Sequence, residues 1–270
     1  MADGRSATRL TLAEARRRGQ DSAHLDADPT YARLALRRVS PAISWFVVRY
    51  TPMSADGVTV LSIVLGVIGG LLVAVGTPAS AVAALVLIQT AYLLDIADGE
   101  VARIRGTSGR RGTYLDLVGH FLQNRALYAG ASLSLIAVTG GTWWAVSVGL
   151  LTLGFSMPFG YYARLHVQAG TVAVSAANPE HGSRLRVARP GGADPGRWAG
   201  WLYRRAAFIW NTPASMNLFS IALLIDALRG AGGTTDPLAV PVLIAVFGPT
   251  LAAKQVGNAI RLLRSADWRA

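Results

Sequence analysis

Long apolar runs alternate with short polar connections along most of this chain. The runs cover residues 57–76, 80–100, 113–138, 142–164, 213–229 and 238–262. Each is close to the ~20 residues that a helix needs to cross the hydrocarbon core of a bilayer, and the fifth is the shortest. Gly66, Gly69 and Gly70 in the first run would allow close helix contact. The pattern predicts an all-α integral membrane protein with six transmembrane helices.

Basic residues fall in alternate connections. Nine Arg precede the first run, four lie around the second connection and six lie in the fourth, whereas the first and third connections have none. The fifth connection has only Arg229, at its edge. Because Lys and Arg concentrate in cytoplasmic connections, this alternation predicts a multi-pass protein of the cell membrane with both termini in the cytoplasm.

The N-terminal part of the chain is polar and rich in Arg. It lacks the charged, apolar and small-residue pattern of a cleaved signal peptide. Residues 11–50 fit either helices that lie in the membrane interface, with Arg near lipid phosphates, or a basic arm without fixed structure. We therefore expect a cytoplasmic or interfacial N-terminal segment, 1–50, and a six-helix membrane catalytic domain, 51–265, which includes a cytoplasmic loop and interfacial segment at 165–212.

Composition narrows the classes of partner and metal site. The chain has 270 residues, of which 52% are hydrophobic, and a formal net charge of +11. Since the basic residues lie between apolar runs and form no single soluble face, we expect no nucleic-acid partner, and an anionic membrane surface or substrate fits better. Cysteine is absent, so any metal bound by this sequence needs oxygen or imidazole ligands.

Ionisable residues inside two of the runs are the candidates for chemistry. Asp95 and Asp98 are three residues apart and lie about 60° from each other on a helix, and Asp116 and His120, four apart, share a face. A charged group near the centre of a membrane helix costs about 2.5–3.5 kcal/mol, so such residues persist mainly where they line a cavity or bind a ligand. The short connection makes the two helices antiparallel neighbours, so their polar faces can meet at one depth.

Three carboxylates that converge in a low dielectric repel one another unless a cation lies among them. Oxygen ligands suit hard divalent ions, so we expect one or two Mg²⁺ or Mn²⁺ ions, with phosphate oxygens completing the ligand shell. The alternative is that these carboxylates pair with nearby Arg at the membrane surface.

The spacing closely resembles the signature of the CDP-alcohol phosphotransferase (CDP-alcohol phosphatidyltransferase) family, Asp-x2-Asp-Gly-x2-Ala-Arg-x8-Gly-x3-Asp-x3-Asp. The residues at its positions here are Asp95, Asp98, Gly99, Ala102, Arg103, Gly112 and Asp116. Seven fixed positions within 26 residues make this a specific match. The family's six spans and N-terminal interfacial helices extend the resemblance to about residues 30–265.

The resemblance implies a membrane transferase of phospholipid-type synthesis. Such an enzyme moves a phospho-alcohol group from a CDP-activated donor to the hydroxyl of a small polar acceptor, plain or phosphorylated, and releases CMP. CDP-diacylglycerol is the leading donor, because the helices are embedded in lipid, and another CDP-alcohol is the alternative. The resemblance also implies a homodimer and an active site that faces the cytoplasm.

The resemblance also assigns roles to individual residues. Metal ligation would fall to Asp95, Asp98 and Asp116, and space for the cytidine would be left at Gly99, Ala102 and Gly112. Arg103 would lie near the nucleotide or a phosphate. Asp56 and Thr59 belong to a partial match to the family's Pro-Asn-x-Val-Thr segment and would line the nucleotide site.

His120 departs from the signature, whose last position is an Asp. The family's carboxylate is generally assigned as the base toward the acceptor hydroxyl, and histidine can accept a proton near neutral pH, so Asp116 and His120 would form the catalytic pair. An imidazole suits Mg²⁺ less well than an oxygen ligand, which puts a second metal in question. Three readings stay open: His120 is the base, the base lies elsewhere, or the chain is an inactive relative that binds nucleotide.

Some basic residues lie well inside the later apolar runs, away from their ends. Arg125 and Lys254 would favour an anionic acceptor or donor tail, although each could instead reach the membrane surface or pair with a carbonyl. Intramembrane charges also mark ion pathways, so a transporter is a further class of function. The acidic motif occurs once and no inverted repeat is visible, which disfavours that class.

Overall fold

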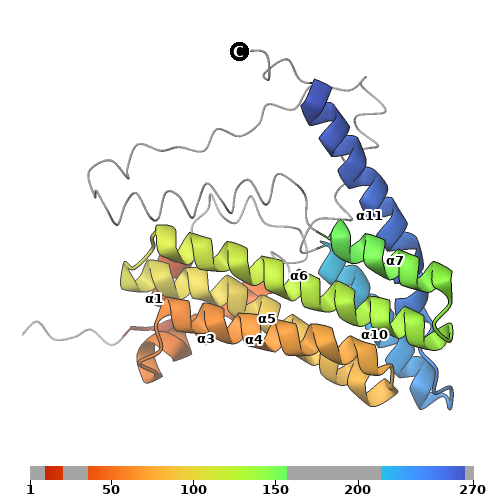
Figure 1. The fold of residues 1–270 in the computed structure, drawn as a ribbon. Helices are drawn as coiled ribbons and strands as arrows, with labels where there is room; N and C mark the ends of the chain where they lie inside the picture. Colours follow the sequence, from red (N-terminus) through yellow and green to blue (C-terminus); the bar gives the residue numbers. More distant parts are fainter. Residues whose placement is uncertain (1–9, 21–35, 157–213, 265–270) are drawn as a thin grey trace, which may run out of the picture.

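The computed structural model describes residues 10–20, 36–156 and 214–264, and all regular structure within these ranges is helical. The helices are α1 (Leu12–Gly19), α3 (Arg37–Tyr50), α4 (Ala55–Leu72), the 3-10 helix η2 (Val73–Val75), α5 (Pro78–Arg105), α6 (Arg110–Val138), α7 (Trp143–Gly154), α10 (Ala214–Ala231) and α11 (Ala239–Arg264). The predicted all-α class is thus confirmed for the described part of the chain (Figure 1).

Three helical stretches in the described ranges are long and apolar enough to cross a membrane. They are Ala55–Val75, Pro78–Arg105 and Ala239–Ile260. Helix α6 has 29 residues, but Gln123, Asn124 and Arg125 interrupt its apolar sequence. Large apolar side chains are exposed on the outer faces of the helices, as on a surface that meets lipid: Trp143, Leu150, Leu228 and Val246. The protein is therefore membrane-embedded, while six spans and cytoplasmic termini stay predictions.

Parts of the predicted membrane domain lie outside the described residues. Helix α7 is described to Gly154, so the rest of the expected 142–164 span lies outside the described residues beyond 156. The expected loop and interfacial segment at 165–212 lies outside them entirely.

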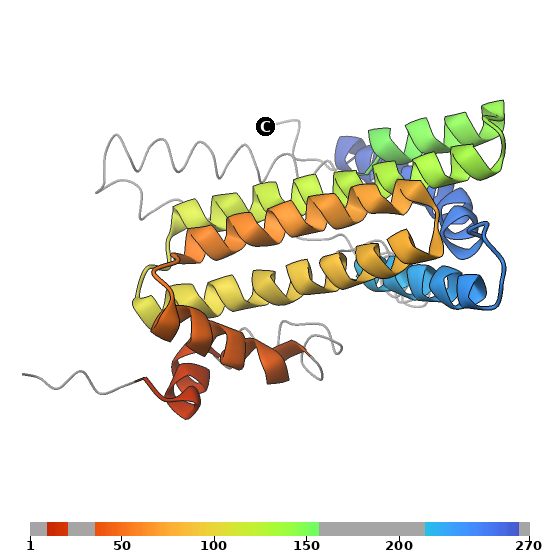
Figure 2. The same ribbon diagram turned by 90° about the horizontal axis from the view of Figure 1, so that it is seen from below.

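Helix α4 packs along both α5 and α6, and the three run side by side (Figures 1 and 2). Its glycines permit this packing. A Cβ built on Gly69 would lie 3.0 Å from Leu87 of α5, and one on Gly66 would lie 2.6 Å from the side chain of Gln123 of α6. On α6, a Cβ on Gly130 would collide with the carbonyl oxygen of Gly70. The expectation of close contact at these small residues is confirmed.

The C-terminal helices pack against the far part of α6 and α5. Tyr128 of α6, Phe219 of α10 and Phe247 of α11 meet with ring centroids 5.6–5.8 Å apart. Buried Asp226 of α10 accepts hydrogen bonds from three backbone N–H groups at the start of α11, at 2.7–3.0 Å. It satisfies donors that a helix start otherwise leaves without partners.

Helices α1 and α3 form within the Arg-rich N-terminal part and pack on α5 (Figure 2). Of the two alternatives for residues 11–50, helix formation holds for these described stretches. The Thr11 hydroxyl accepts from the N–H of Glu14 and starts α1. Arg105 at the end of α5 donates to the backbone carbonyls of Val47, Met53 and Thr51, which fixes the turn between α3 and α4.

Candidate active site

A tight reversal connects the two helices that carry the acidic residues. Helix α5 begins at a capping box between Thr77 and Ser80, with Pro78 at its first position, and ends at Gly106, whose φ of 67° is left-handed. Residues 106–109 form the turn, and its last residue, Gly109, directly precedes α6. Both helices pack chiefly on α4 and far less on each other. A cavity of about 520 Å³ opens here, lined from α3, α4, α5, the turn and α6.

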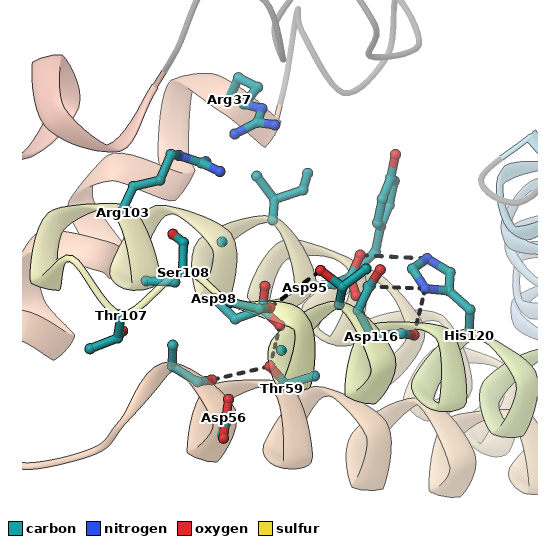
Figure 3. Close-up of a pocket in the computed structure, with 18 residues that line it drawn as sticks. Arg37, Asp56, Thr59, Asp95, Asp98, Arg103, Thr107, Ser108, Asp116 and His120 are labelled. Atoms are coloured by element: carbon teal, nitrogen blue, oxygen red, sulfur yellow. Dashed lines mark hydrogen bonds and ion pairs between the residues drawn. The ribbon is translucent and has the colours of Figure 1, made fainter. Parts of the chain in front are cut away.

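Asp95, Asp116 and His120 meet on one side of this cavity (Figure 3). Each offers one ligand atom, and the three atoms lie within 4.8 Å of one another. His120 Nε2 is 3.7 Å from Asp95 Oδ2, so the contact joins α6 to α5. Two carboxylates and an imidazole form a donor set that fits a divalent cation, and phosphate oxygens or water would fill the remaining positions.

The backbone fixes the orientation of the His120 ring. Its Nδ1 lies 2.9 Å from the carbonyl oxygen of Asp116 and 3.2 Å from Asp116 Oδ1. A carbonyl oxygen can only accept, so Nδ1 carries a hydrogen and donates it. In a neutral ring, Nε2 then holds the lone pair, available to a metal or to a proton.

Asp98 lines the same cavity but has a different partner. The Thr59 hydroxyl of α4 donates to Asp98 Oδ2 at 2.5 Å. Asp98 is not one of the three residues whose ligand atoms gather within 4.8 Å, although Figure 3 shows it beside Asp95. All three predicted metal carboxylates therefore line one cavity, and His120 rather than Asp98 completes the tightest group.

The remaining predicted residues of the signature are also brought together. Gly99, Ala102, Arg103 and Gly112 line the cavity, as do Asp56 and Thr59 of the weaker segment match. The Arg103 guanidinium lies beside Gly99, because a Cβ built there would be 3.3 Å from Arg103 Nη1. Asp56 pairs with exposed Arg111 at 3.2 Å.

Arg125 and Lys254 are not among the lining residues of this cavity. Arg125 follows His120 by five residues, which turns it about 140° around the helix, and its guanidinium lies 5.0 Å from the centroid of the Phe121 ring. Their expected roles in substrate binding stay predictions.

Arg37 of α3 lines the cavity as well, and sequence reasoning did not select it. It lies 58 residues before Asp95 among several other Arg, so no local pattern distinguishes it. Only the docking of α3 on α5 brings it to the site.

The match to known proteins falls on this part of the chain. A family model described as CDP-alcohol phosphatidyltransferase matches residues 53–178, which contain the whole signature and α4 to α7. The match covers 126 of the 270 residues, and this region is similar to the CDP-alcohol phosphatidyltransferase family. The family transfers a phospho-alcohol group from a CDP-alcohol, and its members typically depend on a divalent metal. None of the curated proteins matches the chain.

Proposed function

We propose that this protein is an active, metal-dependent CDP-alcohol phosphatidyltransferase that transfers a phosphatidyl group from CDP-diacylglycerol to a small polar alcohol. The observation that carries this proposal is the convergence of Asp95, Asp116 and His120 beside Asp98 in one cavity. Embedding in the membrane favours a lipid-linked donor over a soluble one. The cell membrane, a cytoplasmic active site and a homodimer belong to the same proposal.

The acceptor hydroxyl attacks the phosphorus distal to the nucleoside. A new P–O ester bond forms, the bridging P–O bond of the diphosphate breaks, and CMP leaves with that bond's electron pair. His120 Nε2 takes the hydroxyl proton, because the Asp116 carbonyl holds the other ring nitrogen as a donor.

The carboxylates prepare the site for the donor. Asp95, Asp98 and Asp116 would hold Mg²⁺ or Mn²⁺, and such an ion would neutralise the diphosphate and stabilise the leaving phosphate. The Thr59 hydrogen bond keeps one Asp98 oxygen fixed, so the carboxylate keeps its direction toward the cavity. Gly99, Ala102 and Gly112 leave the adjoining wall open for the nucleoside.

An anionic acceptor is the second part of the proposal. Arg125 lies beyond His120 on α6, and Lys254 lies on α11, which packs against α6. Basic groups inside a membrane protein favour a phosphorylated substrate near them. Comparing phosphorylated with plain polyols as acceptors tests this part, and equal kcat/KM for both would contradict it.

CMP release from CDP-diacylglycerol in detergent, with Mg²⁺ or Mn²⁺ and a panel of alcohols, tests the activity. We expect release by the parent and by Asp236→Asn, an exposed control, and loss in Asp98→Asn. Release that Asp98→Asn retains in full would contradict the assigned site.

The second candidate is a non-catalytic relative that binds the nucleotide, and the observation that favours it is the imidazole at the last position of the signature. CDP binding without CMP release from any CDP-alcohol would favour this candidate.

A further inference from the structure

Glu100 of α5 is a buried carboxylate that has no role in the transfer described above. Its exposed fraction is 1%, and it does not line the cavity. It lies two residues after Asp98, which turns it about 200° around the helix, away from the cavity face. Ionic groups at such depth require partners, so the partners of Glu100 indicate what it does.

Four side chains donate hydrogen bonds to the Glu100 carboxylate, and all come from the N-terminal part of the chain. The donors are Ser40 Oγ at 2.6 Å, Ser44 Oγ at 2.7 Å, Gln20 Nε2 at 3.1 Å and Arg37 Nη1 at 3.3 Å. Gln20 follows α1 and the others lie on α3. Because these donors satisfy the carboxylate only when both helices are docked, Glu100 ties α1 and α3 to the helix that carries Asp95 and Asp98.

The same docking places two guanidinium groups at the cavity. Arg37 lines it, and Gln20 Nε2 also donates to the Arg37 carbonyl at 2.7 Å, which holds the start of α3. Arg103 Nε donates to the carbonyl of Gly19, the last residue of α1, at 2.5 Å. A Cβ on Gly19 would lie 3.1 Å from Glu100 Cβ, so α1 and α5 are in direct contact there.

Figure 3 shows Arg37 and Arg103 on the same side of the cavity, at the opposite end from His120. The cavity thus has Asp95, Asp116 and His120 at one end and two guanidinium groups at the other. A guanidinium presents a planar fork of N–H donors that matches phosphate oxygens, and burial strengthens such bonds.

We propose that Glu100 is a positioning residue that docks α1 and α3 on α5, and that Arg37, placed by this docking, binds the donor's phosphates together with Arg103. The inference rests on the proposed function, since it assigns a partner to the diphosphate of that donor. The N-terminal helices are then part of the donor site, and removing the Glu100 carboxylate weakens donor binding without reaching the reacting atoms.

The experiment combines CDP binding, steady-state kinetics with CDP-diacylglycerol, and a distance between spin labels in the full chain. For Arg37→Gln we expect about tenfold weaker CDP binding and a similar rise in KM for the donor, with kcat within about threefold of the parent. Glu100→Ala has the same kinetic effect. Glu100→Gln keeps an oxygen for the donors and retains most of the affinity. Glu14→Gln removes a carboxylate of α1 outside this network and leaves binding unchanged.

Spin labels report docking directly, because the chain has no cysteine and two can be introduced at exposed positions, Ala13→Cys on α1 and Leu122→Cys on α6. The distance distribution stays narrow in the Arg37→Gln background and broadens in the Glu100→Ala background. A narrow distribution with Glu100→Ala would overturn the positioning role. Unchanged CDP affinity and donor KM in Arg37→Gln would overturn the phosphate role even where Glu100→Ala fails to fold.

The two proposals fail in different ways. If the parent neither binds CDP nor releases CMP, the proposed function and the phosphate role of Arg37 are both overturned, while the spin-label distances still decide the role of Glu100. If the parent is active and Arg37→Gln matches it in every measurement, only the further inference is overturned.

Discussion

The substitution His120→Asn distinguishes the roles of the two ring nitrogens of His120. The Asn side-chain N–H₂ reaches the position of Nδ1 and can still donate to the carbonyl of Asp116, which is 2.9 Å from Nδ1 in the parent. Nothing in Asn reaches the position of Nε2, 3.7 Å from Asp95 Oδ2. The substitution therefore removes the atom that we assign to proton transfer and keeps the local helix contact.

General base catalysis contributes about 10²–10⁴-fold to a rate, so we expect kcat of His120→Asn to fall by that factor, equivalent to about 3–5 kcal/mol. The KM for the donor changes little, because the guanidinium groups lie at the other end of the cavity. His120→Asp restores the family's carboxylate, and we expect it to recover most of the lost rate. CMP release under saturating donor and acceptor measures all three proteins.

Thermal unfolding tests whether the substitution damages the structure. The unfolding temperature of His120→Asn should match that of the parent within a few degrees. A kcat for His120→Asn within about threefold of the parent would refute the assignment, since a base worth 10²-fold or more would then have been removed without effect. The base would have to lie elsewhere in the cavity, with His120 only lining it.

Three further outcomes follow from the packing and the ligand set. Gly130→Ala should lower the free energy of unfolding by about 1–3 kcal/mol, because the added methyl group meets the Gly70 carbonyl. Gly154→Ala is the control, since no atom lies within 4 Å of the added methyl group, and it should leave the free energy of unfolding unchanged. Equal unfolding temperatures of the two variants in detergent would contradict this prediction. Asp226→Ala should cost about 2–4 kcal/mol by the same measurement, since three N–H groups lose their acceptor, and no loss would dismiss the capping role. EDTA should abolish CMP release, and Mg²⁺ or Mn²⁺ should restore it, because the three carboxylates assigned to the metal suit either ion; activity that survives EDTA would argue against a metal.

Residue spacing predicted much of the site, because helical geometry relates close positions directly. The three- and four-residue gaps between Asp95 and Asp98 and between Asp116 and His120 place each pair on one face, and all four line the cavity. The glycines of α4 were also predicted, since close helix contacts favour residues without side chains. Thr59 came from a partial family segment and proved to be the partner of Asp98.

Contacts between segments that are distant in the sequence could not be predicted from residue spacing. Nothing near Glu100 in the sequence indicates that its partners lie 56–80 residues earlier, at Gln20 and on α3. The grouping of His120 with Asp95 and Asp116, rather than an equal sharing among three Asp, depends on side-chain directions that spacing does not define. Arg125 was selected for its charge and depth; it does not line this cavity, and its role in substrate binding stays a prediction.

Helices α5 and α6 both pack on α4, so substitutions on α4 can change the geometry of the site. Since the two helices touch α4 more than each other, the separation between Asp95 on one and His120 on the other is set by a third helix that supplies neither residue. A larger side chain at Gly66 would push α6 outward and change the distances between the metal ligands on α5 and α6 without replacing any of them. Evolution could thus retune metal choice or acceptor size through substitutions on α4 while the reactive groups stay constant.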